Sequence, residues 1–348
     1  MKLLVDVMGT PANSGGMNLY ARELLSAWAE EFPRDDLVVV GGAWAVEQFG
    51  GYENVTVIVR RGSSIVPRAW AQLVTSGITA RTRHCDALLS LSPIASPLVP
   101  RRRRAAVIHD WRHLRRPDEF GLAQRLYRTL WRWSAHSVGT AVAISQKTAT
   151  ETEQYAHPRR VVVVENGGDH PRRWAHADRQ VSPPLVVTYG HFVNKRPEPV
   201  IDAIAQLRRT GVEVALCVLG AKGDYRERLR DAAREVGSED AILLPGFVAD
   251  DEYQRIVQRA SVLVLNSSDE GFGLPVSEAR YLGIPAVVAN DSGLQDIHGS
   301  SVIAVAPTAD ALSGAIRGAL DSRGDAVRPP QSWATCAAAI RKTLTPEE

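Results

Sequence analysis

Two carboxylates flank a glycine turn in the second half of the chain. Glu270 and Glu278 lie on either side of Gly271-Phe-Gly273, and Pro275 follows the turn. The apolar, β-branched run 261–266 directly before it predicts a buried parallel strand. Proline suits the first turn of a helix, because its missing N–H has no partner to lose there. The sequence therefore predicts a strand, a glycine turn and a helix N-terminus, where free N–H groups and the helix dipole favour an anion.

The spacing of the two glutamates resembles the E-x7-E signature of retaining GT-B glycosyltransferases, in particular glycosyltransferase family 4. This resemblance implies that Glu270 lies by the donor sugar and that Glu278, on the first turn of the helix, binds the ribose of a nucleotide-sugar. It also implies that the diphosphate meets the backbone of Gly271, Phe272, Gly273 and Leu274. The same spacing fits an ordinary strand-to-helix turn with two solvated carboxylates, so the other motifs must decide.

A second motif follows the predicted strand 185–189 and begins at Gly190. The family usually reads G-R-x-x-x-x-K at this point. Here His191 replaces the arginine, Arg196 occupies the lysine position, and Lys195 is its neighbour. Either cation could face the diphosphate, and a solvated pair is the alternative.

The first half of the chain contains two further candidate segments. Gly15-Gly16 follows the first strand and resembles the family's G-G-x-x-x-Y loop, which implies a donor-phosphate contact for the glycines and an acceptor contact for Tyr20. His109-Asp110 ends the predicted strand 105–109, and ligands gather at such carboxyl ends in open α/β sheets. The resemblance implies that His109 lies next to the sugar. We assign it to the catalytic residues and Asp110 to acceptor binding.

Shorter loops agree with the same family in order and spacing. Phe247 and Val248, within Pro245-Gly-Phe-Val248, resemble the loop that lies against the nucleotide base. Residues 290–293 resemble the turn after the next strand, and 165–169 resemble a P-N-G-v-D turn in which Glu165 replaces the proline. The resemblance covers most of residues 1–340, is specific in 186–298, and is weakest over 40–100.

Short β-branched runs alternate with helical stretches throughout, which predicts parallel sheets in an α/β fold. We expect a GT-B architecture of two Rossmann-like, doubly wound domains facing a central cleft, with domains at 1–175 and 176–327. The polar, proline-containing stretch 169–184 is the predicted linker. Residues 328–348 form either a helix that crosses back to the first domain or a plain terminal helix. The thirteen predicted strands are 2–7, 37–41, 55–59, 87–91, 105–109, 138–144 and 161–165, then 185–189, 214–219, 241–244, 261–266, 286–289 and 301–305.

The composition is that of an ordinary globular protein. The 348 residues are 45% hydrophobic and 23% charged, with a net charge of +2, which argues against a general nucleic-acid binder. The three cysteines are widely separated, so no zinc site or disulfide framework is indicated. The N-terminus does not read as a signal peptide, and no apolar run approaches a transmembrane length, which favours a cytoplasmic protein.

The sequence predicts a retaining, metal-independent hexosyltransferase. No D-x-D pair is present to hold a divalent metal against a diphosphate, and we expect no cofactor. The donor is a nucleotide-diphosphate sugar, with UDP or GDP and a hexose such as mannose or glucose left open. Three alternatives remain: a GT-B sugar-nucleotide epimerase or inverting transferase, which would lack the E-x7-E motif; a dinucleotide oxidoreductase, which would need G-x-G-x-x-G after the first strand; and an inactive scaffold.

Arginine and aromatic residues crowd one part of the first half, between residues 101 and 133. In the helix predicted over 122–134, Leu122, Leu126, Leu130 and Trp133 share one face, and the arginines lie off it. Such a helix could rest on anionic lipid, so that the enzyme makes peripheral contact with the inner membrane face. The acceptor would then be lipid-linked or otherwise anionic. A polysaccharide acceptor is the alternative. A core-facing helix with a solvated basic rim is the other interpretation.

Overall fold

The computed structural model describes residues 1–12, 14–62, 64–117, 120–177, 181–321 and 330–344. Within these residues all thirteen predicted strands are present, at positions close to those expected. They are β1 (Lys2–Asp6), β2 (Asp36–Gly41), β3 (Val55–Val59), β4 (Ala87–Ser90), β5 (Arg104–Ile108), β6 (Thr140–Ala143), β7 (Val161–Val163), β8 (Leu185–Tyr189), β9 (Ala215–Leu219), β10 (Ile242–Gly246), β11 (Ala260–Leu265), β12 (Ala286–Ala289) and β13 (Ile303–Val305).

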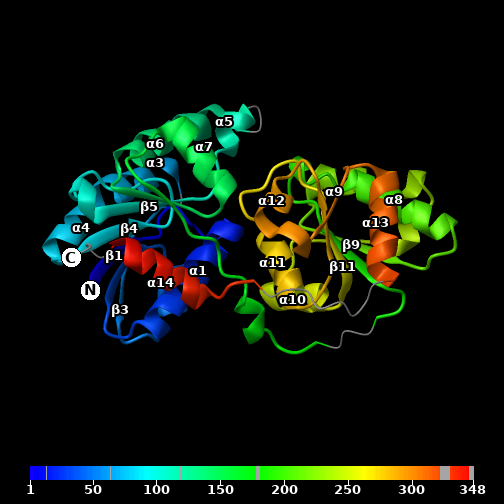
Figure 1. The fold of residues 1–348 in the computed structure, drawn as a ribbon, viewed down its shortest axis with the longest axis horizontal. Helices are drawn as coiled ribbons and strands as arrows, with labels where there is room; N and C mark the ends of the chain where they lie inside the picture. Colours follow the sequence, from blue (N-terminus) through cyan, green and yellow to red (C-terminus); the bar gives the residue numbers. More distant parts are fainter. Residues whose placement is uncertain (13, 63, 118–119, 178–180, 322–329, 345–348) are drawn as a thin grey trace. The chain divides into compact units, whose positions relative to one another are not determined.

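The strands form two parallel sheets. The first has the order β3-β2-β1-β4-β5-β6-β7 and the second the order β10-β9-β8-β11-β12-β13. In each sheet the order reverses beside the first strand, at β1/β4 and at β8/β11, and ligands of open α/β sheets bind outside the strand ends at such a switch point. The predicted α/β fold with two doubly wound sheets is confirmed (Figure 1).

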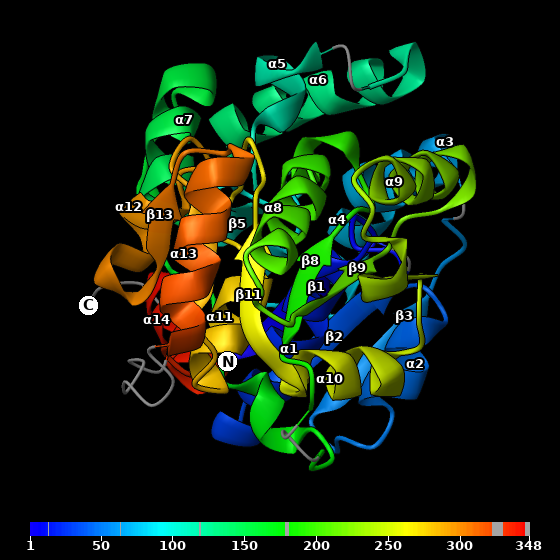
Figure 2. The same ribbon diagram turned by 90° about the vertical axis from the view of Figure 1, so that its right-hand side faces the viewer.

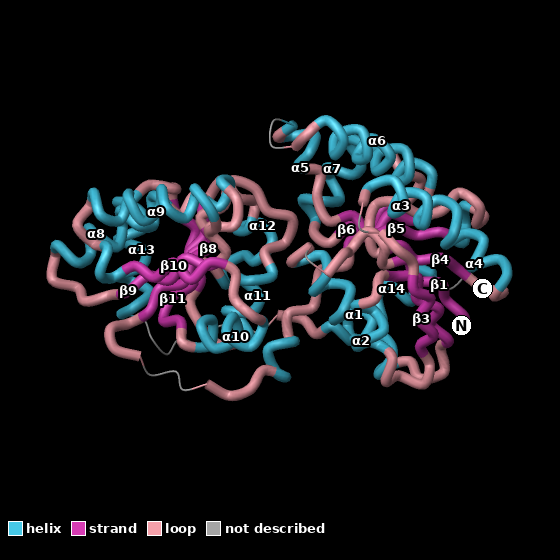
Figure 3. The backbone as a smooth tube through the Cα atoms, turned by 180° about the vertical axis from the view of Figure 1, so that it is seen from behind, coloured by secondary structure: helices cyan, strands magenta, loops and turns pink. Residues whose placement is uncertain are grey.

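Helices follow almost every strand. Figure 3 shows the strands at the centre of each sheet region, with helices covering both faces of each sheet. They are α1 (Gly16–Glu31), α2 (Trp44–Phe49), α3 (Ile65–Trp70), α4 (Ser76–Thr82), α5 (Arg112–Arg115), α6 (Leu122–Ser137), α7 (Gln146–Ala156), α8 (Glu198–Arg209), α9 (Gly223–Glu235), α10 (Asp250–Gln258), α11 (Leu274–Tyr281), α12 (Leu294–His298), α13 (Ala309–Asp321) and α14 (Trp333–Leu344). A π-helical turn, Ala71–Thr75, joins α3 to α4.

Alternate side chains of the second sheet enter two different cores. Val186 on β8 packs with residues of α8, α9 and α13, whereas its neighbour Val187 packs with residues of α10, α11 and α12. Helices α8 and α13 lie side by side on the first of these faces (Figure 2). Because both faces are buried, the strands need continuous apolar runs, which is the pattern that identified them in the sequence.

The last helix, α14, packs against α1 although the two are far apart in the sequence (Figure 1). Its Arg341 donates hydrogen bonds of 2.7 and 3.0 Å to the buried carboxylate of Asp35. The same carboxylate accepts hydrogen bonds from the Met1 ammonium at 2.7 Å and from Trp28 at 3.0 Å. These charge-assisted bonds attach α14 to the segment between α1 and β2, where Asp35 lies.

The chain divides into two compact units, Met1–Gly167 with Gln331–Glu348, and Gly168–Pro330. The division falls before the boundary expected near residue 175. His170 and Pro171 are buried in the second unit, and Trp174 packs on its core. The predicted linker 169–184 therefore begins as part of the second unit. Its residues 178–180, and residues 328–329 and 345–348 of the predicted terminal extension, lie outside the described residues.

A membrane-spanning segment was not expected from the sequence. Among the described residues, no helix combines the length and the apolar character needed to cross a bilayer.

Candidate functional site

The loops after β8 and β11 lie close together at the carboxyl ends of their strands, because these two strands are parallel neighbours in the second sheet. Lys195, in the β8 loop, and Glu270, after β11, form an ion pair with Nζ 2.5 Å from Oε1. Both side chains are largely buried. Burial opposes ionisation of Glu270, but the charge and hydrogen bond of Lys195 hold the pKa of that carboxyl below its ordinary value. The structure thus joins a predicted diphosphate ligand to a predicted sugar ligand.

Arg196 has a different environment from its neighbour Lys195. Its backbone is left-handed, with φ of 45°, and its guanidinium donates to both carboxylate oxygens of Asp291 at 2.6 and 2.9 Å. Its Nε donates to the carbonyl of Asn266 at 2.8 Å, and the Asn266 amide donates back to the Arg196 carbonyl at 2.9 Å. Arg196 therefore clamps the β8 loop to the end of β11 and to the turn after β12.

The glycine turn before α11 leaves no room for a side chain at position 273. Gly273 has φ of +80°, which side chains larger than hydrogen rarely allow, and a Cβ there would lie 2.5 Å from a methyl of Leu294. The side chains of Phe272 and Leu274 are buried, whereas Gly271 is partly exposed. Position 273 therefore requires a glycine.

His298 is hydrogen-bonded to the backbone of this turn, a contact that was not predicted from the sequence. Its Nε2 bonds to the carbonyl of Phe272 at 2.8 Å, and its Nδ1 accepts from Arg280 at 3.0 Å. Burial lowers the pKa of His298 to about 4, so the ring is neutral near pH 7. Because a carbonyl only accepts, Nε2 carries the proton. A lone histidine in a helix end gave no sequence signal for this contact.

Both carboxylate oxygens of Glu278 are hydrogen-bonded to protein groups. The helix α11 begins at Leu274, so Glu278 is on its second turn and not, as expected, on the first. Its side chain is buried, with a residue exposure of 1%. Oε1 bonds to His170 Nε2 at 2.9 Å and Oε2 accepts from the Tyr253 hydroxyl at 2.5 Å. The Tyr189 hydroxyl lies 3.0 Å from that of Tyr253. A ribose can therefore reach this carboxylate only if a protein partner moves.

The remaining predicted donor residues of the second unit lie at the same strand ends. Gly190 follows β8 directly. Phe247, which follows β10, exposes 66% of its surface, and the Lys222 ammonium lies 5.4 Å from its ring centre. Val248 is partly buried against the core. An exposed aromatic ring at this place offers a flat surface on which a nucleotide base could stack.

In the first unit, His109 follows β5 and is buried to 7% exposure. Its Nε2 lies 3.0 Å from the Leu91 carbonyl, so Nε2 carries the proton of the neutral ring. Burial lowers the pKa of His109. The Tyr20 ring packs edge-on against His109 and Trp333, with ring centres 4.9 and 5.5 Å apart. Tyr20 is fully buried, so in this structure its ring contacts His109 and Trp333 of α14, and the expected acceptor contact stays a prediction.

Gly15 and Gly16 remain accessible at the start of α1. Both are exposed, and Gly15 has φ of +56° with no side chain capping the helix. Backbone N–H groups at an exposed, uncapped helix start are available to an anion.

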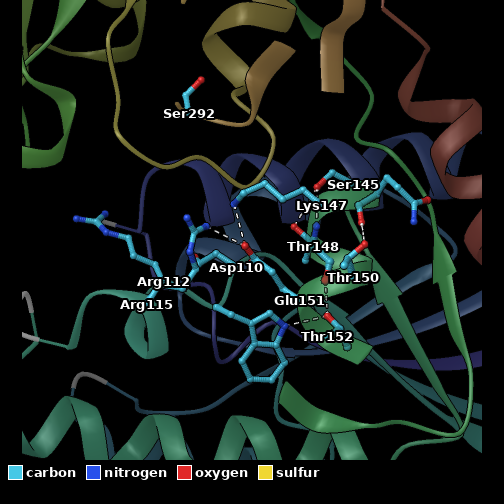
Figure 4. Close-up of polar contacts among 12 residues, drawn as sticks. Asp110, Arg112, Arg115, Ser145, Lys147, Thr148, Thr150, Glu151, Thr152 and Ser292 are labelled. Carbon is cyan, nitrogen blue, oxygen red and sulfur yellow. Dashed lines mark hydrogen bonds and ion pairs between the residues drawn. The ribbon is translucent and has the colours of Figure 1, made fainter. Parts of the chain in front are cut away.

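Asp110, next to His109, belongs to a charged group at the ends of β5 and β6. Its carboxylate accepts from the Arg112 backbone at 3.0 Å. Nearby on α7, Glu151 pairs with Arg115 at 2.8 Å and with Lys147 at 3.1 Å (Figure 4). Asp110 is partly exposed, so its carboxylate stays accessible to a hydroxyl group.

The two-sheet architecture is shared with proteins of known structure. Solved structures with the same two-sheet architecture include a sucrose-phosphate synthase from Thermosynechococcus elongatus, with a TM-score of 0.69 at 19% identity over 99% of this chain and 93% of that one. Anabaena Alr3699/HepE in complex with UDP-glucose also has a TM-score of 0.69, at 20% identity over 99% and 95% of the two chains. The chain has the GT-B fold of glycosyltransferases.

Residues 175–337 match the family model described as Glycosyl transferases group 1. A glycogen synthase of Mycobacterium tuberculosis is 29% identical over 216 residues, which are 60% of this chain and 52% of the relative. The match thus spans about half the length of that relative. These matches confirm the predicted resemblance to GT-B glycosyltransferases and to Glycosyl transferases group 1, whereas the retaining mode that the E-x7-E motif implies stays a prediction.

Proposed function

We propose that this protein is a retaining glycosyltransferase that moves a hexose, such as glucose or mannose, from a nucleotide-diphosphate sugar to a hydroxyl acceptor. The observation that carries the proposal is the ion pair between Lys195 and Glu270 beside the glycine turn. It places a cation and a carboxylate at the carboxyl edge of the second sheet, next to the topological switch point, where α/β proteins bind nucleotides.

The chemistry follows from what leaves and what attacks. The bond between the sugar's anomeric carbon and the diphosphate breaks, and the acceptor oxygen bonds to that carbon on the same face. The acceptor proton passes to an oxygen of the departing diphosphate. Lys195 and the amides of the turn at Gly271–Leu274 stabilise the negative charge that develops, which is usually the largest catalytic contribution. Glu270, kept ionised by Lys195, accepts hydrogen bonds from the sugar hydroxyls.

Lys195 is the better candidate for the diphosphate contact. Arg196 is held by two hydrogen bonds to Asp291 and one to the Asn266 carbonyl, so reaching a ligand would cost those bonds. Lys195 is paired with one carboxylate, that of Glu270, and a diphosphate offers its ammonium more negative charge than one carboxylate does. In this proposal Arg196 shapes the loop.

The donor nucleotide and the acceptor are separate questions. Anabaena Alr3699/HepE, a neighbour in fold, was solved with UDP-glucose, which makes UDP-sugars the first donors to test. Glu278 remains the proposed ribose ligand, Phe247 and Val248 the proposed base loop, and Gly15 and Gly16 a further phosphate contact. His109 and Asp110 are proposed for the sugar and the acceptor. No cofactor and no metal are proposed.

The test is to incubate the protein with UDP- and GDP-sugars and measure release of free nucleotide, with a thermal-shift panel of the same donors. We expect one donor to raise the melting temperature and to release nucleotide, slowly with water and faster with an acceptor. A product whose anomeric proton coupling matches that of the donor establishes retention. Inverted product, or a sugar epimerised at C2, would replace the proposal, and no response to any donor would refute it.

A further inference from the structure

Large apolar side chains are exposed on two neighbouring helices of the first unit. The short helix α3 and the long helix α6 contact each other (Figures 1 and 3). Their exposed residues form what we call the α3–α6 face: Val66 (77% exposed), Trp70 (65%), Leu122 (82%), Leu126 (73%) and Trp133 (46%). Scattered single apolar residues are normal on a surface, whereas large apolar side chains grouped on adjoining helices are typical of interaction sites.

The folding of α6 does not require these side chains. Its opposite side already supplies the core with Trp131 and Ala135, and Leu130 packs partly buried against the same core. The Tyr127 hydroxyl also donates to Gln72 Oε1 at 2.6 Å, which ties α6 to the turn that follows α3. The periodicity predicts Leu130 on one face with Leu122, but in the structure Leu130 packs against the core while Leu122 is exposed. The helix has a core side and a second, outward apolar side.

The surroundings of the face are basic. Arg125 and Arg132 are exposed on α6, and in the sequence each directly precedes an exposed apolar residue, Leu126 or Trp133. The sequence has no aspartate or glutamate in residues 54–85 or in residues 120–150. Asp118 and Glu119, just before α6, lie outside the described residues. The positive charge also characterises the whole unit, whose sequence holds 23 Lys and Arg against 17 Asp and Glu, whereas the second unit holds 18 against 22.

We infer that the α3–α6 face binds the surface of a lipid bilayer that contains acidic phospholipid. Leucine and tryptophan side chains enter the boundary between headgroups and acyl chains, and arginines pair with anionic headgroups. A second copy of this chain fits less well, because a twofold contact places the same basic patch against itself. The inference deepens the proposed function, since a transferase held at a bilayer is suited to a lipid-linked acceptor, but the binding itself uses no residue of the donor site.

The experiment is co-sedimentation of the full chain with vesicles of phosphatidylcholine alone and of phosphatidylcholine with 30% phosphatidylglycerol, without nucleotide-sugar. We expect binding to the acidic vesicles, weaker binding to the neutral ones, and loss of affinity as salt rises, because salt screens exposed charges. Replacing both arginines, Arg125→Gln and Arg132→Gln, removes two basic groups and is expected to weaken acidic-vesicle binding roughly 30-fold.

A second variant tests the apolar contribution. Leu126→Gln should weaken binding to both vesicle types. The matched controls lie in the second unit: Arg228→Gln with Arg259→Gln changes the charge equally at two exposed sites, and Leu243→Gln alters another exposed leucine. We expect the controls to bind as the parent chain does. All variants are checked for melting temperature and for donor binding by calorimetry, which should be unchanged.

Three outcomes would overturn the inference. The first is no sedimentation with acidic vesicles. The second is equal loss in the control variants, which would make the attraction non-specific. The third is a dimer in analytical ultracentrifugation that Leu126→Gln dissociates, which would assign the face to a second copy. Donor binding that survives while vesicle binding fails would leave the proposed transferase activity intact, so the two failures are distinguishable.

Discussion

The carboxylate of Glu278 accepts a hydrogen bond from the Tyr253 hydroxyl, with Oε2 and Oη 2.5 Å apart. Tyr253 belongs to α10 and Glu278 to α11, and both pack on the same face of the second sheet. With His170 bonded to the other oxygen, the proposed ribose ligand is occupied before a nucleotide arrives. Donor binding at this carboxylate must compete with an internal hydrogen bond.

The first prediction follows from that competition. Tyr253→Phe removes the competing hydroxyl and should tighten nucleotide-sugar binding, whereas Glu278→Ala should weaken it about tenfold or more, since a hydrogen bond to a charged group contributes roughly 1.5–3 kcal/mol. Calorimetric titration of the donor measures both. Tyr225→Phe is the control, because Tyr225 donates a similar 2.8 Å bond to Glu198 in the same unit. Equal affinity of Glu278→Ala and the parent chain, with folding intact, would exclude the ribose role.

The second prediction distinguishes Lys195 from Arg196. Lys195→Ala should lower kcat roughly 100-fold or more, as loss of a group that stabilises transition-state charge does. Arg196→Ala should lower the melting temperature as well, because it releases Asn266 and Asp291. Steady-state kinetics and thermal unfolding separate the two effects. Arg208→Ala, which breaks a surface pair with Asp240, is the control. The opposite pattern, with activity lost only in Arg196→Ala, would reverse the assignment.

The third prediction concerns metal. We expect activity with the preferred donor to be unchanged by EDTA, because cations of the chain replace a metal at the diphosphate. Assays with and without EDTA, followed by added magnesium, check this. Activity that disappears with EDTA and returns with magnesium would show that the metal-free mechanism is wrong.

The fourth prediction is a pH dependence of stability from Asp35. Burial opposes its ionisation, but bonds from Arg341, the Met1 ammonium and Trp28 lower its pKa to about 2, against 3.8 when unfolded. The folded carboxyl is thus the stronger acid, and its contribution of about 2 kcal/mol is complete above pH 4 and is lost as the pH falls toward 2. Urea unfolding at pH 6 and pH 3 should show a smaller drop for Asp35→Asn than for the parent chain. Identical drops would contradict the prediction.

The fifth prediction concerns His298. Burial lowers its pKa to about 4 from 6.5, so the unfolded chain binds the proton more tightly. The stability that the neutral ring contributes is therefore present above pH 6.5 and is lost as the pH falls toward 4. His298→Gln should remove part of the decline in unfolding free energy over this window, and His176→Gln, at an exposed position, should not. A parent chain whose stability is flat between pH 6.5 and 4 would contradict the assignment.

The sequence alone determined the fold and the motifs. All thirteen strands were found from short apolar runs, because central strands such as β4 and β12 are buried on both faces and are therefore apolar at most positions. The turn at Gly271–Gly273 and its following helix were likewise predicted, since glycine permits a positive φ in a tight turn and proline suits the first turn of a helix. The boundary between the two units was predicted less exactly, near residue 175, whereas the structure divides after Gly167. Composition marks 169–184 as a linker, but burial of His170 and Trp174 attaches its start to the second unit.

Only the tertiary structure decided which polar side chains meet. His170 reaches Glu278 across 108 residues, and Arg341 reaches Asp35 across 306. No local window contains such pairs, because they depend on how helices pack on a sheet. The direction of α6 is a further case: period alone grouped Leu122 with Leu130, while packing buries Trp131 and leaves Leu122 in solvent. Periodicity identifies a helix with two apolar sides, but only the neighbouring elements determine which side enters the core.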